Sequence, residues 1–195
     1  MLLTLIAQQG FSMKETLNLN FRSARIEDAD PIKRIVNSAY RGTSGTAGWS
    51  NEAHLLSGNR IEKHHIIDII NKSNLDILVA LSNENIVASM CVEKLNDKES
   101  YFSMLAVEPK LQSCGIGRRM FTEIENFSHL SFNSQTYILE VITLRKDLIH
   151  FYNRLGYQQT GQISEFPFSS AVGESLVGSL YIERMEKHRK CKINS

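Results

Sequence analysis

The stretch Gln112-Ser113-Cys114-Gly115-Ile116-Gly117 follows an apolar run over residues 104–107 and opens a helical pattern of Ile116, Met120, Ile124 and Phe127. A strand that passes through a short glycine-containing loop into a helix can hold phosphate. Glycine lets the backbone approach a ligand closely, and the first N–H groups of a helix are free. Lys110, Arg118 and Arg119 add positive charge nearby. The stretch therefore predicts an anion-binding loop, with neither P-loop spacing nor the three glycines of the dinucleotide motif.

A second strand–helix unit follows the first. Residues 136–142 are apolar, and Leu148, Phe151, Tyr152 and Leu155 then recur at helical spacing. Gly156 stands where a helix commonly ends. Two such units in succession favour parallel or mixed pairing of their strands, with both helix N-termini at the same end of the sheet.

Together, in this order and at this separation, the two units resemble the GNAT superfamily of N-acetyltransferases. The family has Gln/Arg-x-x-Gly-x-Gly/Ala opening one helix and Tyr-x-x-Leu-Gly-Phe/Tyr ending a later one, as in residues 112–117 and 152–157. The resemblance covers about residues 21–187. It implies an α/β (α+β) fold with a mixed, mostly antiparallel sheet of about seven strands. Two parallel central strands would splay apart, and helices would flank the sheet.

Local patterns predict the remaining elements. Leu17, Leu19 and Phe21 alternate with polar residues and indicate a first strand, and Ile32, Ile35, Val36 and Ala39 form the apolar face of a helix. A second helical region is expected over residues 51–56 and 61–71. Strands are expected over 77–81, 86–94, 100–107, 157–163 and 176–185, the first two joined by a turn at 82–85.

Bulk properties favour one domain without a strongly charged partner. The chain has 195 residues and a net charge of +1, so no basic field indicates a nucleic-acid or membrane partner. Three scattered cysteines suit a reducing cytoplasm. We expect the domain to span 17–187, followed by a basic tail over 188–195. For the leader over 1–16, disorder and a true start at Met13 are both open.

The resemblance implies an acyl-CoA-dependent N-acyltransferase. Acetyl would pass from acetyl-CoA, the co-substrate, to a primary amine by direct attack. The acceptor would be a small molecule or a protein amine, and a homodimer is compatible with the family. A non-catalytic acyl-CoA-binding or regulatory module is the alternative. No metal is expected, because the spacing of His54, His64 and His65 forms no recognised ligand set.

The same resemblance places the cofactor on the glycine loop and on the strand before it. Backbone N–H groups of residues 113–118 would bind the pyrophosphate, and Gln112 would orient the loop. The N–H of Val107 would stabilise the oxyanion, and Tyr152 would assist the leaving thiolate. The predicted cofactor-binding residues are Leu105, Ala106, Val107, Gln112, Ser113, Cys114, Gly115, Ile116, Gly117, Arg118 and Arg145. A nucleophilic Cys114 is a rival, but no partner histidine is evident.

Two departures from the family leave roles open. Arg145 stands where many relatives have an asparagine, and it would either reach a phosphate or point to solvent. The strand before the loop has Tyr101-Phe102-Ser103 and no acid, so the general base is unidentified. The candidates are a water chain, Glu52, Glu93, Glu108 and Glu140.

The acceptor site is predicted from one further segment. Gly48-Trp49-Ser50-Asn51-Glu52 resembles a subgroup with a Gly-Trp-x-x-Glu loop, whose pattern does not define a substrate. In the family this region forms a wall of the acceptor pocket. Tyr40, Trp49 and Glu52 are therefore predicted to contact the substrate. For Trp49 the alternative is a ring that covers the edge of the core.

Overall fold

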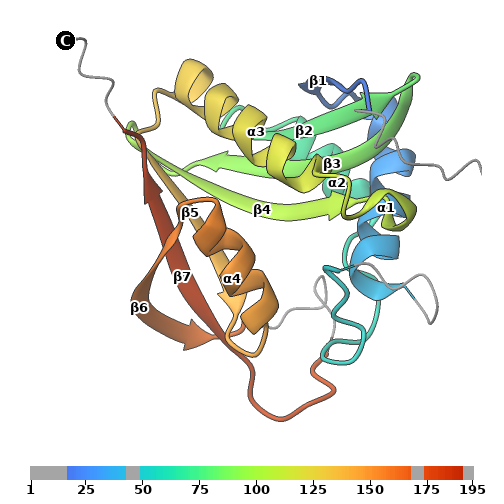
Figure 1. Cartoon of the computed structure of the whole chain (residues 1–195). Helices are drawn as coiled ribbons and strands as arrows, with labels where there is room; N and C mark the ends of the chain where they lie inside the picture. The colour runs from blue at the N-terminus through green and yellow to red at the C-terminus, as the bar shows by residue number, and fades with distance from the viewer. Residues whose placement is uncertain (1–16, 43–48, 168–173, 191–195) are drawn as a thin grey trace, which may run out of the picture.

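A computed structural model describes residues 17–42, 49–167 and 174–190. Its strands form one sheet in the order β1-β2-β3-β4-β5-β7-β6, in which only β4 and β5 pair in parallel. The predicted mixed fold is therefore confirmed (Figure 1). The strands are β1 (Asn20–Ser23), β2 (Leu75–Ser82), β3 (Asn85–Lys94), β4 (Glu99–Val107), β5 (Thr136–Ile142), β6 (Gln158–Glu165) and β7 (Tyr181–His188).

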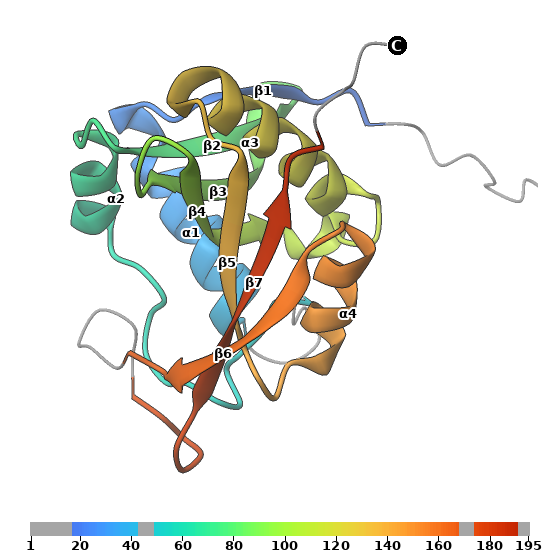
Figure 2. The ribbon, with the colours of Figure 1, turned by 90° about the vertical axis from the view of Figure 1, so that its left-hand side faces the viewer.

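Helices cover both faces of the sheet (Figures 1 and 2). One face packs against α1 (Ala29–Arg41) and α2 (Lys63–Ile70), and the other packs against α3 (Ile116–Phe132) and α4 (Lys146–Arg154). Two short 3-10 helices, Ile26–Asp28 and Pro109–Leu111, precede α1 and α3. The strands β2 and β3 are apolar and buried over most of their length because helices cover both faces of the sheet there.

The alternation of side chains along β2 shows the two cores directly. Leu78 and Ala80 belong to the core beneath α3 and α4, whereas Ile77, Val79 and Leu81 belong to the core beneath α1 and α2. Successive residues of a strand point to opposite faces, so one strand supplies both cores. The predicted apolar face of α1 is confirmed, since Ile32, Ile35, Val36 and Ala39 are all buried.

The two central strands diverge, which opens the sheet at one end. Their parallel pairing runs only from Glu99↔Thr136 to Tyr101↔Ile138, after which β4 and β5 separate (Figure 1). A bulge in β4 adds to this divergence. The pairing of β4 with β3 shifts between Ser89↔Ala106 and Cys91↔Ser103, and Met104 adopts a left-handed φ of 53°. A bulge bends its strand, and it commonly lies next to a functional site.

Some predicted boundaries are wrong. Residues 51–56 form turns instead of a helix, because the Asn51 side chain accepts from the N–H of Ala53 and Leu56 bridges to Ser175. The last strand begins at Tyr181 instead of 176. It also extends beyond residue 185 to His188, and the ammonium group of Lys187 on this strand donates to Glu125. The leader lies outside the described residues, as do residues 191–195 of the predicted tail.

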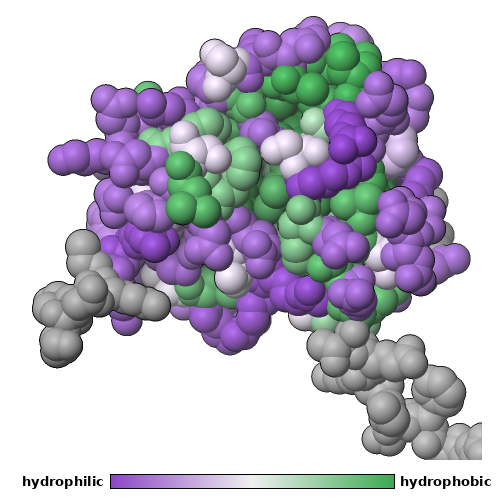
Figure 3. Space-filling view, turned by 90° about the horizontal axis from the view of Figure 1, so that it is seen from above, coloured by the Kyte–Doolittle hydropathy of each residue, from purple (hydrophilic) through white to green (hydrophobic). Residues whose placement is uncertain are grey.

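The exterior is mixed in character. Seen from above, apolar side chains gather in the middle of the surface, with polar ones around most of its rim (Figure 3). Among the described residues, no helix combines the length and apolar character that a membrane crossing requires.

Candidate active site

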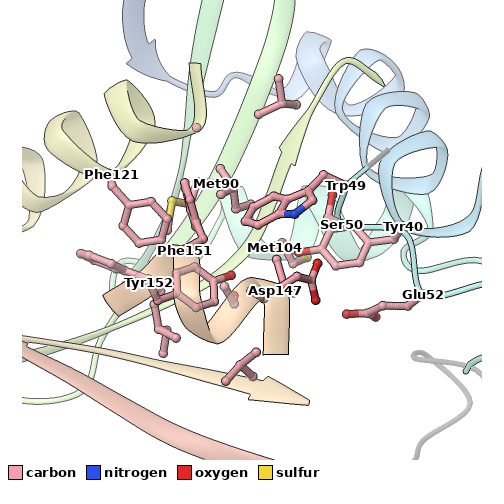
Figure 4. Close-up of a pocket in the computed structure, with 18 of the residues that line it drawn as sticks. Tyr40, Trp49, Ser50, Glu52, Met90, Met104, Phe121, Asp147, Phe151 and Tyr152 are labelled. Atoms are coloured by element: carbon pink, nitrogen blue, oxygen red, sulfur yellow. The ribbon is translucent and has the colours of Figure 1, made fainter. Parts of the chain in front are cut away.

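A cavity of about 710 Å³ lies where β4 and β5 separate (Figure 4). One side, which we call the loop wall, consists of Gln112, Ser113, Gly115, Gly117 and Arg118. Another part of the lining, which we call the side-chain wall, consists of Tyr40, Glu52, Arg60, Tyr101 and Glu140. Tyr152 on α4 lines the same cavity. The splay of the sheet therefore joins the predicted cofactor loop to the predicted acceptor residues.

The loop wall presents free backbone donors. Ser113 and Gly115 adopt left-handed φ angles of 66° and 79°, and α3 begins immediately afterwards. No described residue accepts a hydrogen bond from the N–H groups of residues 113–118. These N–H groups and the positive end of the helix dipole favour an anion. Cys114 is exposed and does not line the cavity.

Gly117 leaves room on the cavity side without being required by packing. A Cβ at this position would lie 3.7 Å from the ring of Phe151 and 3.9 Å from Leu105, which is ordinary contact. Gly115 differs, because its φ of 79° disfavours any side chain although the space around it is open. The two glycines of the motif therefore serve different purposes, one for backbone conformation and one for access.

At the end of β4, the N–H of Val107 points toward the gap between β4 and β5. The N–H of Glu108 donates to the carbonyl of Val87 at 2.8 Å, so alternation of the ladder turns the N–H of Val107 away from β3. The carbonyl of Val107 accepts from Gln112 Nε2 at 3.1 Å. By the same alternation Ala106 faces β3, and it does not line the cavity. The expectation of a cofactor contact from Ala106 is therefore not supported.

Tyr152 lies on the cavity-facing side of α4 among other aromatic rings. Its ring centroid is 5.7 Å from that of Phe121 and 5.5 Å from that of Phe151 (Figure 4). Burial raises the pKa of Tyr152 well above its usual value, and Tyr40 and Glu52 act in the same direction. No described residue hydrogen-bonds its hydroxyl group, which keeps its proton at neutral pH and can donate it to a ligand.

Glu52 is the most buried acid in the cavity, and its residue is 8% exposed. Its carboxylate lies 3.4 Å from a guanidinium nitrogen of Arg41. Burial nevertheless raises the pKa of Glu52, against the opposing charges of Arg41, Arg60 and Arg145. Removal from water disfavours the charged form, and such a carboxylate is suited to accept a proton near neutral pH.

Two phenols interact with acids of the cavity. Burial, followed by the charge of Glu52, raises the pKa of Tyr40 to about 12. The Tyr101 hydroxyl donates to Glu140 at 3.1 Å. Of the four acids considered as general base, Glu52 and Glu140 line the cavity, whereas Glu93 and Glu108 do not. Glu52 and Glu140 are thus the candidate side chains that reach the cavity, beside the predicted alternative of a water chain.

Arg145 does not line the cavity, and neither predicted role fits it. Its side chain is 8% exposed and pairs with Asp147 through two hydrogen bonds of 3.0 and 2.9 Å. It also donates to the carbonyls of Trp49 and Asn51. Because its donors are engaged within the protein, Arg145 positions the loop that carries Glu52, instead of reaching a phosphate or solvent.

Hydrogen bonds hold the backbone of Trp49 between Gln112, in the loop before α3, and Arg145, directly before α4. Its N–H donates to Gln112 and its carbonyl accepts from Arg145, so Gln112 orients this segment as well as its own loop. The indole lies edge-on against Phe151, with ring centroids 4.6 Å apart. It lines the cavity and is 40% exposed. A substrate contact and a covering of the core edge are both compatible with this position.

The sequence analysis missed many members of the lining, among them Arg60, Tyr101 as a partner of Glu140, and Phe151. Arg60 belongs to no motif, and only the folding of its loop against α1 brings it to Tyr40, with its guanidinium carbon 5.5 Å from the ring centroid. In the part of the chain that the structure describes, no three His, Cys, Asp or Glu side chains form a group that could hold a metal.

The comparisons with known proteins agree with this geometry. Residues 73–159 match the model of the acetyltransferase (GNAT) domain. A comparison with curated protein sequences returned no match.

Solved structures of similar fold include an N-acetyltransferase from Staphylococcus aureus Mu50, at 16% identity and a TM-score of 0.67 over 88% of this chain and 97% of that one. The ribosomal-protein-S18-alanine N-acetyltransferase from Escherichia coli has 15% identity and a TM-score of 0.63, over 91% and 99%. The spermidine/spermine N-acetyltransferase from Vibrio cholerae has 15% identity and a TM-score of 0.61, over 89% and 94%. Residues 73–159 therefore resemble a GNAT acetyltransferase domain, and the chain has the fold of these solved N-acetyltransferase structures.

Proposed function

We propose that this protein transfers an acetyl group from acetyl-CoA to a primary amine. The observation that carries the proposal is the single cavity that joins the free N–H groups of the loop wall to Glu52 and Tyr152. The first feature suits a pyrophosphate, and the other two suit the proton transfers of aminolysis. A cytoplasmic location belongs to the same proposal, as does an acceptor that is either a small molecule or a protein amine.

In this proposal the chain holds the thioester through its backbone. The N–H groups of residues 113–118 bind the pyrophosphate, and the edge of β4 at Leu105 and Val107 lies along the pantetheine arm. The N–H of Val107 then donates to the thioester carbonyl as negative charge develops on its oxygen. One such donor is worth about 2.7–4 kcal/mol of the barrier.

Glu52 accepts the proton that the ammonium form of the acceptor must lose. The neutral nitrogen attacks the thioester carbon, a C–N bond forms, and the C–S bond breaks. Glu52 is preferred over Glu140 because Glu140 is exposed and accepts the hydrogen bond of Tyr101, whereas Glu52 is withdrawn from water. After attack the nitrogen loses a second proton, which goes to the departing thiolate, so the proton held by Glu52 is the one finally released to solvent.

Tyr152 stabilises the departing thiolate. Because its pKa is raised by burial, the phenol remains protonated and donates a hydrogen bond to sulfur, instead of giving up its proton completely. This role requires that the Tyr152 hydroxyl group does not already donate to another acceptor. No described residue accepts a hydrogen bond from it.

The test is Tyr152→Phe, assayed for thiol release from acetyl-CoA with a panel of amines and for CoA binding by calorimetry. We expect kcat to fall roughly 10- to 100-fold while CoA binding changes little, because the ring remains and only the hydrogen bond is lost. Tyr181→Phe is the matched control, since Tyr181 is 42% exposed and does not line the cavity.

Two outcomes would reject the proposal. Wild-type kinetics in Tyr152→Phe would remove the role of the phenol. Tight CoA binding without thiol release, whatever amine is offered, would instead indicate a non-catalytic acyl-CoA-binding module.

A further inference from the structure

The side-chain wall contains a cation that the reaction above does not use. Arg60 lines the cavity, and its guanidinium lies over the Tyr40 ring. No described residue forms an ion pair with it or accepts a hydrogen bond from its guanidinium. A half-buried guanidinium with unused donors in a ligand cavity is suited to bind an anionic group of the ligand.

The backbone at Arg60 is held in place by α1. The Asn37 side chain accepts from the N–H groups of Arg60 and Ile61, at 2.7 and 3.1 Å, and donates to the carbonyl of Ile61 at 2.9 Å. The cation–π contact with Tyr40 then restrains the guanidinium. Arg60 is therefore presented to the cavity by its surroundings, unlike a flexible surface arginine.

Charge pairing around the cavity leaves Arg60 without a dedicated counter-ion. Glu52 has Arg41 as its nearest cation, at 3.4 Å, and Asp147 pairs with Arg145 at 2.9 Å. Glu140 accepts from Tyr101. A polycationic acceptor would meet repulsion from Arg60 and find two of the three lining carboxylates already paired. An amine that also carries a carboxylate would match both Arg60 and a proton-accepting acid.

Resting on the function proposed above, we propose that the acceptor is a small zwitterionic amine whose carboxylate binds Arg60 while its amino group faces Glu52. A carboxylate is favoured over a phosphate because a single planar guanidinium pairs with it through two parallel hydrogen bonds and balances its one charge. Simple amines and polyamines would lack this contact.

The experiment compares acids with their carboxamides. Alanine, phenylalanine, β-alanine and γ-aminobutyrate are each paired with the corresponding amide, which keeps the shape and removes the charge. Binding is measured by calorimetry in the presence of CoA, which cannot react, and kcat/KM is measured with acetyl-CoA. We expect at least one acid to bind roughly 10- to 100-fold more tightly than its amide.

Substitutions assign the preference to Arg60. Arg60→Gln should abolish the acid-over-amide ratio, and Arg60→Lys should retain part of it. Arg25→Gln should leave it unchanged, since Arg25 is exposed and does not line the cavity. The ratio is the proper readout, because removing Arg60 also changes the charge around Glu52 and would alter the rates with acid and amide alike.

The outcomes separate this inference from the function on which it rests. Acid-over-amide binding that depends on Arg60, without turnover, would support the acceptor class and reject the transfer reaction. Equal binding of acids and amides, a preference that survives Arg60→Gln, or better use of diamines or peptide N-termini than of acids would overturn the inference, even if thiol is released.

Discussion

The loop wall and the side-chain wall enclose the same cavity but are built differently. The loop wall comes from one continuous segment, and its backbone N–H groups do the binding. The side-chain wall takes residues from α1, from the loops around Glu52 and Arg60, and from β4 and β5. The first needs a backbone conformation and the absence of side chains, whereas the second needs particular functional groups brought together by folding.

This difference predicts opposite sensitivities. Adding atoms to the loop wall should impair cofactor binding, and removing functional groups from it should matter little. In the side-chain wall, a change of one charge or hydroxyl group should alter catalysis or selectivity without affecting the cofactor. The following predictions test the contrast, from the largest expected effect to the smallest.

Glu52→Gln should have the largest effect, a loss of roughly 10²–10⁴ in kcat at neutral pH, because general base catalysis contributes about this much. Burial raises the pKa of Glu52 above the usual 4.5, so the wild-type rate should rise with pH through that pKa and level off above it. The Glu52→Gln variant should lack this rising limb of the pH–rate profile. A rate profile over pH with two amines of different basicity checks this, since the limb due to Glu52 does not move with the amine. If the variant keeps the limb, Glu52 is not the base.

Gly117→Val should weaken CoA binding by about tenfold or more, because the side chain would stand between the ligand and the N–H groups. Calorimetry with CoA measures this effect, and thermal unfolding measures stability. Gly115→Ala is the informative partner. Because residue 115 has a φ of 79°, which disfavours a Cβ, this variant should lower the free energy of unfolding by about 1–2 kcal/mol. Unchanged CoA binding in Gly117→Val would contradict the proposed seat of the pyrophosphate.

Arg145→Gln should raise KM for the acceptor several-fold and lower the free energy of unfolding by about 2 kcal/mol, because the Trp49–Asn51 segment loses its anchor. Arg145 lowers the pKa of Asp147, so this pair stabilises the fold above the usual pKa of an aspartate. That contribution is lost as pH falls through the lowered value. The stability gap between variant and wild type should therefore narrow in acid, and denaturant titrations at several pH values measure it. A gap that is constant with pH would show that the pair contributes nothing.

Cys114→Ser should have the smallest effect, within about twofold on kcat and on CoA affinity, because the thiol is exposed and Cys114 does not line the cavity. Steady-state kinetics on the purified variant measure it. Loss of activity would revive a nucleophilic role for Cys114 and contradict direct attack by the amine.

Local patterns predicted several elements of the sheet well. The 136–142 strand was predicted with its observed bounds, and the hairpin turn at Asn83 and Glu84 adopts the left-handed conformation that such residues tolerate. Residues 51–56 were predicted wrongly as a helix, because their conformation depends on Asn51 and on pairing with Ser175, which is distant in sequence. Arg145 was also misjudged, since its partners lie on a loop far from it along the chain.

The sequence by itself determined the two strand–helix units and the glycine loop between the first strand and its helix, because both depend on residues close together along the chain and on backbone geometry. Only the tertiary structure decided which acids reach the cavity, that Arg145 hydrogen-bonds the Trp49–Asn51 segment, and that Arg60 lines the cavity beside Tyr40. Those features arise from side chains brought together across the splayed strands, and no local pattern specifies such a meeting.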